Sequence, residues 1–204
     1  MDLGHARGCD AAAAAVDQAL CMGYRHIGTA QMYENEADVG RGIANSGVAR
    51  EDIWLTTKID NDNHSFEAVH RSADESLTRL GTDYVDLLLI HWPMFHDAPL
   101  GETLDAMQEL KFAGKVRHLG VSNFSTALVA EAVDNLGHDI LCNHIEYHPY
   151  LSQMAVEGAV RIVADNRCDA AFFGRPATVE AFAPDRGAGA WLPVHRCRVD
   201  HGLC

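Results

Sequence analysis

Two patterns of apolar residues follow each other repeatedly along the first 166 residues, one typical of strands and one typical of helices. They predict strands joined by helices. Short, mostly apolar runs of strand length indicate five strands, at 25–29, 53–59, 84–90, 118–122 and 140–147. Between them, apolar residues recur every three or four positions, which is typical of amphipathic helices. Six helices are expected, near 11–22, 35–44, 66–80, 104–113, 125–136 and 152–166.

The alternation of strands and helices with short connections predicts parallel strands and crossover helices, an α/β fold. No GxGxxG motif follows a strand, which counts against a dinucleotide-binding doubly wound sheet. Polar residues fall at or near the carboxyl ends of strands, where a (β/α)₈ barrel carries its active site. These residues are Lys58, His91, Ser122, Asn123 and His144. We therefore expect a (β/α)₈ TIM-barrel type of fold, incomplete because only five of eight strands are recognisable.

The chain changes character after residue 166. The segment from Cys168 carries arginine but no lysine, and its Gly, Pro and Ala residues follow neither period. We expect residues 1–166 to form a partial barrel and residues 167–204 to be a divergent tail of unclear structure. A change of reading frame near Arg167 and a genuine segment that packs in another way are both open explanations.

Composition and charge narrow the classes of function. The net charge of -13 argues against a nucleic-acid partner. No apolar run approaches the roughly 18 residues of a membrane span, and the amino terminus has no signal pattern, so we expect no membrane partner and a cytoplasmic location. His144 and His148 are four residues apart, but in a strand rather than on a helix face, and no metal site is expected.

Several short motifs occur in the same order as in the aldo-keto reductases. They include Gly23–Ile27, Tyr33-x-Asn35-Glu36, Thr57-Lys58, Ile90–Pro93, Gly114–Arg117, Gly120–Phe124 and Glu146–Tyr150. Over about residues 10 to 165 the chain resembles this family, and most of all its bacterial members that reduce diketo-gluconates and other small carbonyl substrates. The resemblance implies a (β/α)₈ barrel that uses NADPH to reduce an aldehyde or ketone to an alcohol.

The resemblance also assigns roles to single residues. It implies that Tyr33 protonates the carbonyl oxygen, that the nearby ammonium of Lys58 eases release of that proton, and that His91 orients the carbonyl by a hydrogen bond. His91 and Trp92 would contact the substrate. The implied cofactor-binding residues are Thr29, Ser122, Asn123 and His144.

The sequence departs from the family pattern at three places. Gly28 stands where the family has an aspartate that pairs with the lysine, and Asp60 is a conceivable substitute partner. His144 replaces a glutamine. The first strand, the last two strands and the segment that grips the cofactor's phosphates have no counterpart. A reductase weakened by these changes and a catalytically inactive remnant or cofactor-binding relative are both open.

Overall fold

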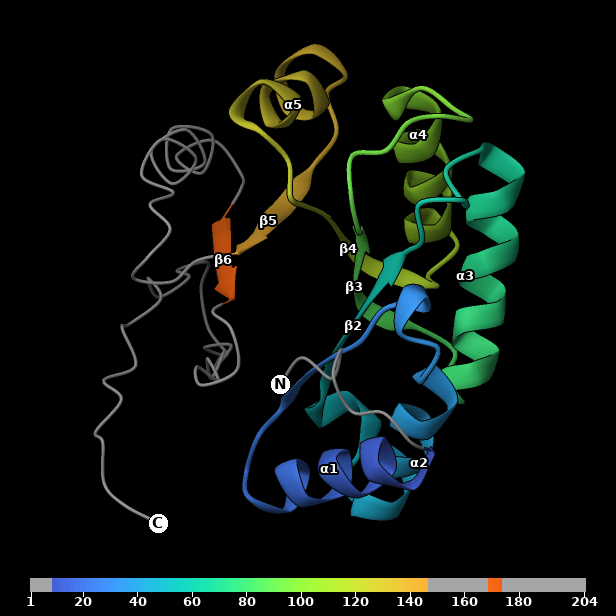
Figure 1. Cartoon of the computed structure of the whole chain (residues 1–204), viewed down its shortest axis with the longest axis vertical. Helices are drawn as coiled ribbons and strands as arrows, with labels where there is room; N and C mark the ends of the chain where they lie inside the picture. The colour runs from blue at the N-terminus through green and yellow to red at the C-terminus, as the bar shows by residue number, and fades with distance from the viewer. Residues whose placement is uncertain (1–8, 147–168, 174–204) are drawn as a thin grey trace.

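Six parallel strands form one curled sheet in the computed structural model, which describes residues 9–146 and 169–173 (Figure 1). The strands are β1 (His26–Gly28), β2 (Trp54–Ile59), β3 (Val85–Ile90), β4 (Val116–Ser122), β5 (Ile140–Glu146) and β6 (Asp169–Phe173). Each strand pairs in parallel with the next one along the chain. Because this order never reverses, successive right-handed crossovers put their helices on the same face, as in a barrel and unlike a doubly wound sheet.

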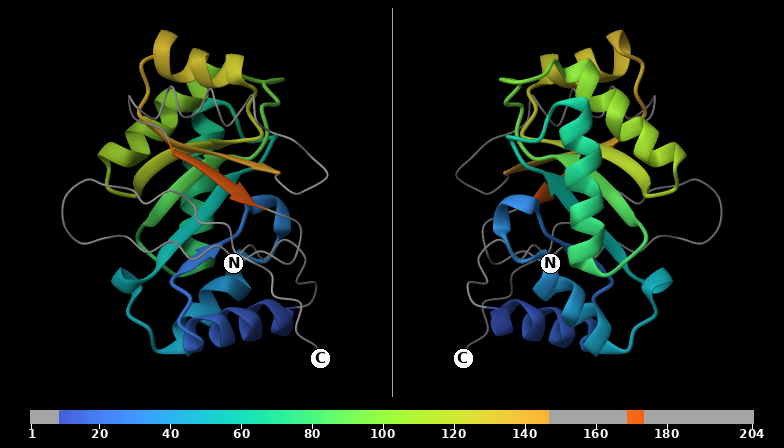
Figure 2. Two further views of the ribbon diagram at one scale, coloured as in Figure 1. Left: turned by 90° about the vertical axis from the view of Figure 1, so that its left-hand side faces the viewer. Right: turned by 90° about the vertical axis from the view of Figure 1, so that its right-hand side faces the viewer.

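The helices cover one face of the sheet. They are α1 (Cys9–Cys21), α2 (Glu36–Ser46), α3 (Phe66–Leu80), α4 (Leu100–Phe112) and α5 (Thr126–Ala130), which a π-helical turn (Glu131–Asn135) extends. Neighbouring helices contact each other in chain order from α1 to α4. In Figure 2, α3 lies in front of the sheet from one side, and the strands face the viewer from the other. The described residues therefore form part of a (β/α)₈ TIM-barrel type of fold.

The apolar core fills the space between this helix layer and the sheet. Successive side chains of a strand point to opposite faces. In β2, Leu55 and Ile59 are buried in the main core, whereas Thr56 and Lys58 belong to the opposite face. Glycines allow close helix packing, because a Cβ atom at Gly40 or Gly42 would overlap the backbone of Leu80 or Ala13. The helix that follows the Tyr33 loop is therefore held between α1 and α3.

The five strands predicted from the sequence are confirmed to within two residues at each end. The five predicted helices that fall on described residues are confirmed as well, with α4 beginning four residues earlier than expected. Strand β6 lies in the segment where no element was expected, and it pairs with β5 from Asp169 to Phe173. Five residues rich in alanine and phenylalanine carry neither period clearly, so only pairing with β5 identifies them as a strand. The helix predicted at 152–166 lies outside the described residues.

Two further classes of feature are absent from the described part of the chain. None of its helices has the length and apolar character needed to cross a membrane. Within the same residues, no group of three or more His, Cys, Asp or Glu side chains is arranged to hold a metal ion.

Candidate active site

Three predicted catalytic side chains meet at the carboxyl ends of neighbouring strands. Tyr33 ends a 3₁₀ turn (η1, Gln31–Tyr33) after β1, Lys58 lies near the end of β2, and His91 directly follows β3. Parallel strands bring their carboxyl ends to one edge of the sheet, so residues from three separate motifs become neighbours. The structure brings these three side chains together.

Lys58 is buried beside the phenol of Tyr33. Its side chain is 5% exposed, and Nζ donates hydrogen bonds to the Thr29 carbonyl oxygen at 3.2 Å and to Tyr33 Oη at 3.3 Å. The ammonium also lies 4.8 Å from the centroid of the Tyr33 ring. A positive charge next to a phenol favours its ionised form. This contact can therefore ease the loss of a proton from Tyr33.

His91 completes the group from the side of β3. Its ring meets the Tyr33 ring edge-on, with 5.5 Å between centroids and 83° between planes. The backbone holds this arrangement, because the His91 N–H donates to Ile59 O at 3.2 Å and His91 O accepts a hydrogen bond from Asn123 Nδ2 at 2.9 Å. The backbone that carries the imidazole is thus fixed to β2 and to the residue that follows β4.

Ser122 and Asn123 present a hydrogen-bonding pair at the end of β4. Asn123 has a φ of 62°, a conformation that asparagine tolerates, and its backbone N–H donates to His144 O at 2.7 Å. Its Nδ2 group donates to Ser122 Oγ at 3.1 Å. Within the described residues, the Ser122 hydroxyl proton and Asn123 Oδ1 form no hydrogen bond. One available donor next to one available acceptor fits a primary carboxamide, such as that of nicotinamide.

His144 lies opposite Ser122 in the sheet and is buried. Burial lowers the pKa of His144 well below its usual value, and the positive charge of Lys58 lowers it further. The ring is therefore neutral at physiological pH. A neutral imidazole offers one donor and one acceptor, so it can still bond a carboxamide in place of the family's glutamine.

Thr29 and Trp92, predicted to contact the cofactor and the substrate, lie next to Lys58 and His91. Thr29 is fully buried, and its hydroxyl donates to Asn35 Oδ1 at 2.7 Å. Trp92 follows His91 and is 44% exposed, which suits a residue at the rim of a pocket. The contact of Thr29 with a cofactor and the contact of Trp92 with a substrate stay predictions.

The position of the family's aspartate is occupied by the backbone of β1. Gly28 pairs with Thr56 and brings no side chain towards Lys58. Asp60, the substitute considered from the sequence, uses Oδ1 to accept a hydrogen bond from the Asn61 N–H at 2.7 Å. Its own N–H donates to Gln31 Oε1 at 2.8 Å. Asp60 is therefore engaged in the turn that follows β2.

The structure adds two polar residues that sequence reasoning missed. Asn143 is fully buried, and its side chain bonds both the N–H and the carbonyl of Phe124, at 3.3 and 3.0 Å. This clamp fixes the loop that carries Ser122 and Asn123. Gln31 bonds three groups around the Tyr33 loop. The available signal was an amide side chain within a strand that begins with three apolar residues in the first case, and an amide side chain next to a site motif in the second.

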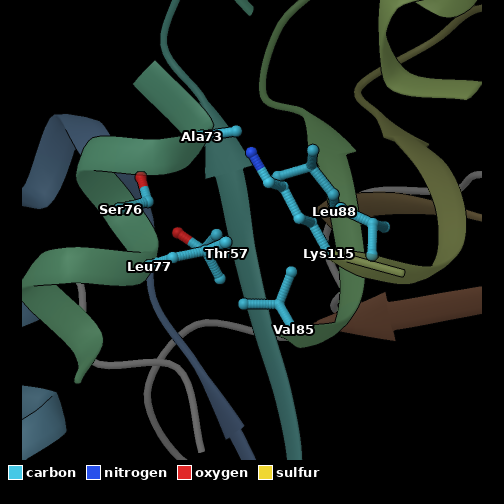
Figure 3. Close-up of a pocket in the computed structure, with 8 residues that line it drawn as sticks. Thr57, Ala73, Ser76, Leu77, Val85, Leu88 and Lys115 are labelled. Atoms are coloured by element: carbon cyan, nitrogen blue, oxygen red, sulfur yellow. The ribbon is translucent and has the colours of Figure 1, made fainter. Parts of the chain in front are cut away.

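A small pocket lies on the other face of the sheet (Figure 3). It is lined by residues of α3, including Ala73, Ser76 and Leu77, and by Thr57 and Leu88 of the strands beneath. Since Thr57 and Lys58 are adjacent in β2, their side chains point to opposite faces. This pocket is therefore separate from the site of Tyr33, Lys58 and His91.

Comparison with known proteins matches residues 8–172 to the Aldo/keto reductase family. A methylglyoxal reductase DkgB of Salmonella typhi is 46% identical over 149 residues, which is 72% of this chain and 56% of that protein. An aldo/keto reductase structure from Brucella melitensis has a TM-score of 0.75 and 42% identity, and the match covers 80% of this chain and 62% of that one. A Bombyx mori aldo-keto reductase in complex with NADP has a TM-score of 0.75 and 33% identity, over 90% and 65% of the two chains.

The chain spans about half the length of the curated relatives that it matches. The family match covers most of the chain, and it includes each predicted site residue. The chain therefore belongs to the aldo/keto reductase family.

Proposed function

We propose that this chain catalyses the NADPH-dependent reduction of an aldehyde or ketone to an alcohol. The observation that carries the proposal is the partly buried contact of 3.3 Å between Lys58 Nζ and Tyr33 Oη, with the His91 ring edge-on to the same phenol. This arrangement provides a proton donor, a charge that assists it and a hydrogen-bonding group within one small volume. Membership of a family of reductases supports the same reaction class.

In the proposed reaction the carbonyl carbon would receive hydride from NADPH, when that cofactor is bound. As negative charge develops on the carbonyl oxygen, Tyr33 donates its phenolic proton to that oxygen. The ammonium of Lys58 stabilises the phenolate that remains, and the imidazole of His91 donates a hydrogen bond that orients the carbonyl. Because Lys58 and His91 are buried, water screens these interactions less than it would at the surface.

The cofactor would be held through its carboxamide by Ser122, Asn123 and His144. The Ser122 hydroxyl can donate to the carboxamide oxygen, and Asn123 Oδ1 can accept from its nitrogen. The relative from Bombyx mori was crystallised with NADP, which supports a nicotinamide cofactor. The preference for NADPH, like the contact with Thr29, rests on the family resemblance.

We propose a small carbonyl compound as the substrate, with a 2-oxoaldehyde as the first to test. The support is the name of the relatives, several of which are methylglyoxal reductases. Exposed Trp92 beside His91 offers an apolar wall for such a molecule. The cytoplasmic location expected from the composition is part of this proposal, and cell fractionation would test it.

A second candidate function is cofactor binding without rapid turnover. The observation that favours it is Gly28, because the family's aspartate is missing beside Lys58, whereas both residues of the proposed carboxamide-binding pair, Ser122 and Asn123, are present. Such a protein would bind NADPH with ordinary affinity and oxidise it slowly in the presence of substrate.

The deciding experiment measures NADPH binding by the full chain through quenching of tryptophan fluorescence, and then NADPH oxidation with methylglyoxal. If the chain is a reductase, we expect saturable binding at micromolar NADPH. We also expect Gly28→Asp to increase the rate of turnover about tenfold, which is a part of the roughly 10²–10⁴-fold rate increase that an acid–base group contributes. Gly28→Asn is the matched control, because it adds similar bulk without charge. Binding without turnover in either variant would favour the second function. A folded chain that binds no NADPH up to millimolar concentration would exclude both.

A further inference from the structure

The loop that carries Tyr33 is anchored on the side of α2 by buried polar contacts. Asn35 accepts the hydrogen bond from the Thr29 hydroxyl. The next residue, Glu36, is also buried, and its carboxylate accepts hydrogen bonds from Thr57 Oγ1 and from Arg79 of α3, the latter at 2.8 Å. The carboxyl end of the loop therefore cannot move without breaking an ion pair and two hydrogen bonds.

Gln31 anchors the other end of the same loop. Its Nε2 group donates to Ser76 Oγ of α3 at 3.1 Å. Its Oε1 atom accepts hydrogen bonds from the Asp60 backbone N–H at 2.8 Å and from Asn63 Nδ2 at 3.1 Å. One side chain thus ties the Tyr33 loop to a helix and to the turn that follows β2.

Two of these contacts join the Tyr33 loop to the end of β2 and the turn that follows it. Gln31 precedes Tyr33 by two residues, and Asp60 follows Lys58 by two residues. The Gln31–Asp60 hydrogen bond and the Lys58–Tyr33 contact therefore join the same two segments at two neighbouring points. The Gln31–Asp60 hydrogen bond therefore restrains the tyrosine loop relative to β2 close to the Lys58–Tyr33 contact.

We propose that Gln31 is a positioning residue that sets the distance between Lys58 Nζ and Tyr33 Oη. The inference rests on the proposed function, in which Tyr33 is the proton donor. The effect of the ammonium on the phenol weakens with distance, so a looser loop would leave Tyr33 with less help in releasing its proton. Gly28 supplies no side chain to this pair, and the loop contacts take that positioning role in this chain.

The test follows the ionisation of Tyr33 in the full chain without cofactor. Tyrosines carrying ¹³C at Cζ give separate NMR titration curves, and Tyr33→Phe identifies the curve of Tyr33. Gln31→Leu keeps the side-chain volume and removes all three hydrogen bonds. We expect Gln31→Leu to lower the ratio of phenolate to phenol at a fixed pH about three- to tenfold. Complete loss of a neighbouring charge would change this ratio by about tenfold or more. Lys58→Met should show that full change.

Matched variants separate positioning from general loosening. Asn63→Ala and Ser76→Ala each remove one of the three contacts, and we expect intermediate changes in the same direction. Ser46→Ala removes hydrogen bonds at the far end of α2, and we expect the Tyr33 titration to stay as in the unchanged chain. Melting curves recorded for all variants show whether each one is folded over the pH range used.

The outcomes distinguish this inference from the proposed function. If Lys58→Met lowers the phenolate ratio and Gln31→Leu does not, Gln31 is not a positioning residue. If Ser46→Ala lowers the ratio as much as Gln31→Leu does, the effect is general loosening and the inference fails. If Lys58→Met has no effect, the two residues are not coupled, which overturns both. The expected titrations in a chain that does not oxidise NADPH would support the inference and count against the reductase.

Discussion

Two buried charges, Asp86 at the amino ends of the strands and Lys58 at their carboxyl ends, are held in different ways. At the amino ends, Asp86 is 2% exposed, and its carboxylate accepts hydrogen bonds from Arg50 at 2.8 Å, Arg117 at 2.9 Å and the Leu55 N–H at 2.9 Å. At the carboxyl ends, the ammonium of Lys58 bonds a carbonyl oxygen and a phenol, both neutral. The first charge is held by opposite charges, and the second is directed at a group that can lose a proton.

The surroundings of Asp86 make its ion pairs rigid. Arg50 and Arg117 stack on the ring of Tyr84 at 4.1 and 4.0 Å, and Arg50 also donates to the carbonyl oxygens of Ile53 and Tyr84. These contacts hold the two arginine side chains in place around the carboxylate. The comparison indicates that the Asp86 cluster stabilises the amino ends of the sheet, while the carboxyl ends hold the proposed site, the division typical of barrel enzymes.

The largest expected effect is on the chemistry of the carboxyl ends. Tyr33→Phe removes the proposed proton donor and keeps the ring, so we expect the rate of NADPH oxidation with methylglyoxal to fall by about 10²–10⁴-fold. NADPH affinity should stay within about twofold, a change well below 1.4 kcal/mol, because the proposed carboxamide-binding pair is Ser122 at the end of β4 and Asn123 directly after it, and does not include Tyr33. Stopped-flow rates and fluorescence titration measure the two quantities. Unchanged turnover in Tyr33→Phe would refute the assignment of the donor.

The next effect is on the stability of the amino ends. Asp86→Ala leaves two arginines without their carboxylate, and we expect the free energy of unfolding to fall by about 3–5 kcal/mol. The control is Asp74→Ala, which removes an exposed ion pair with Lys115 and should cost about 0–1 kcal/mol. Urea denaturation of both variants makes the comparison. Equal losses would mean that the Asp86 cluster stabilises no more than a surface pair does.

A smaller effect is expected where a buried amide supports the site. Asn143→Leu leaves the N–H and carbonyl of Phe124 unpaired in an apolar setting, and an unsatisfied group of this kind costs about 1–3 kcal/mol. The loop of Ser122 and Asn123 should loosen, so NADPH affinity should fall along with stability. Asn135→Ala, which loses an exposed hydrogen bond to Glu131, is the control for calorimetry and binding. A variant with lower stability and unchanged affinity would confine the clamp to a structural role.

The smallest effect concerns pH. Because burial lowers the pKa of His144, the folded chain keeps this ring neutral at a pH where the unfolded chain protonates it. The unfolded state then binds more protons, so stability falls as pH drops below about 6.5, by up to about 1.4 kcal/mol per pH unit for this residue. His144→Gln, the family's residue, should remove that share of the slope in urea melts between pH 7 and 5. The same slope in both proteins would contradict a neutral His144.

Where motifs end strands, sequence reasoning predicted residues that the structure brings together. Tyr33, Lys58 and His91 were predicted as a group, and they lie within contact distance in the structure. It missed Gln31 because the partners of that side chain are up to 45 residues away along the chain. It missed β6 because a short segment without a clear period is identified as a strand only by the neighbour with which it pairs.

The sequence by itself determined the family, the order of strands and helices, and the residue types at the strand ends. Periodicity and short motifs are local properties, and they can be read without knowing which segments meet. The tertiary structure alone decided that Asp60 is engaged in its own turn, that burial lowers the pKa of His144 and that Gln31 ties the Tyr33 loop to the turn after β2. Hydrogen bonding, burial and the pKa of a group depend on atoms brought together from distant parts of the chain, so no local pattern encodes them.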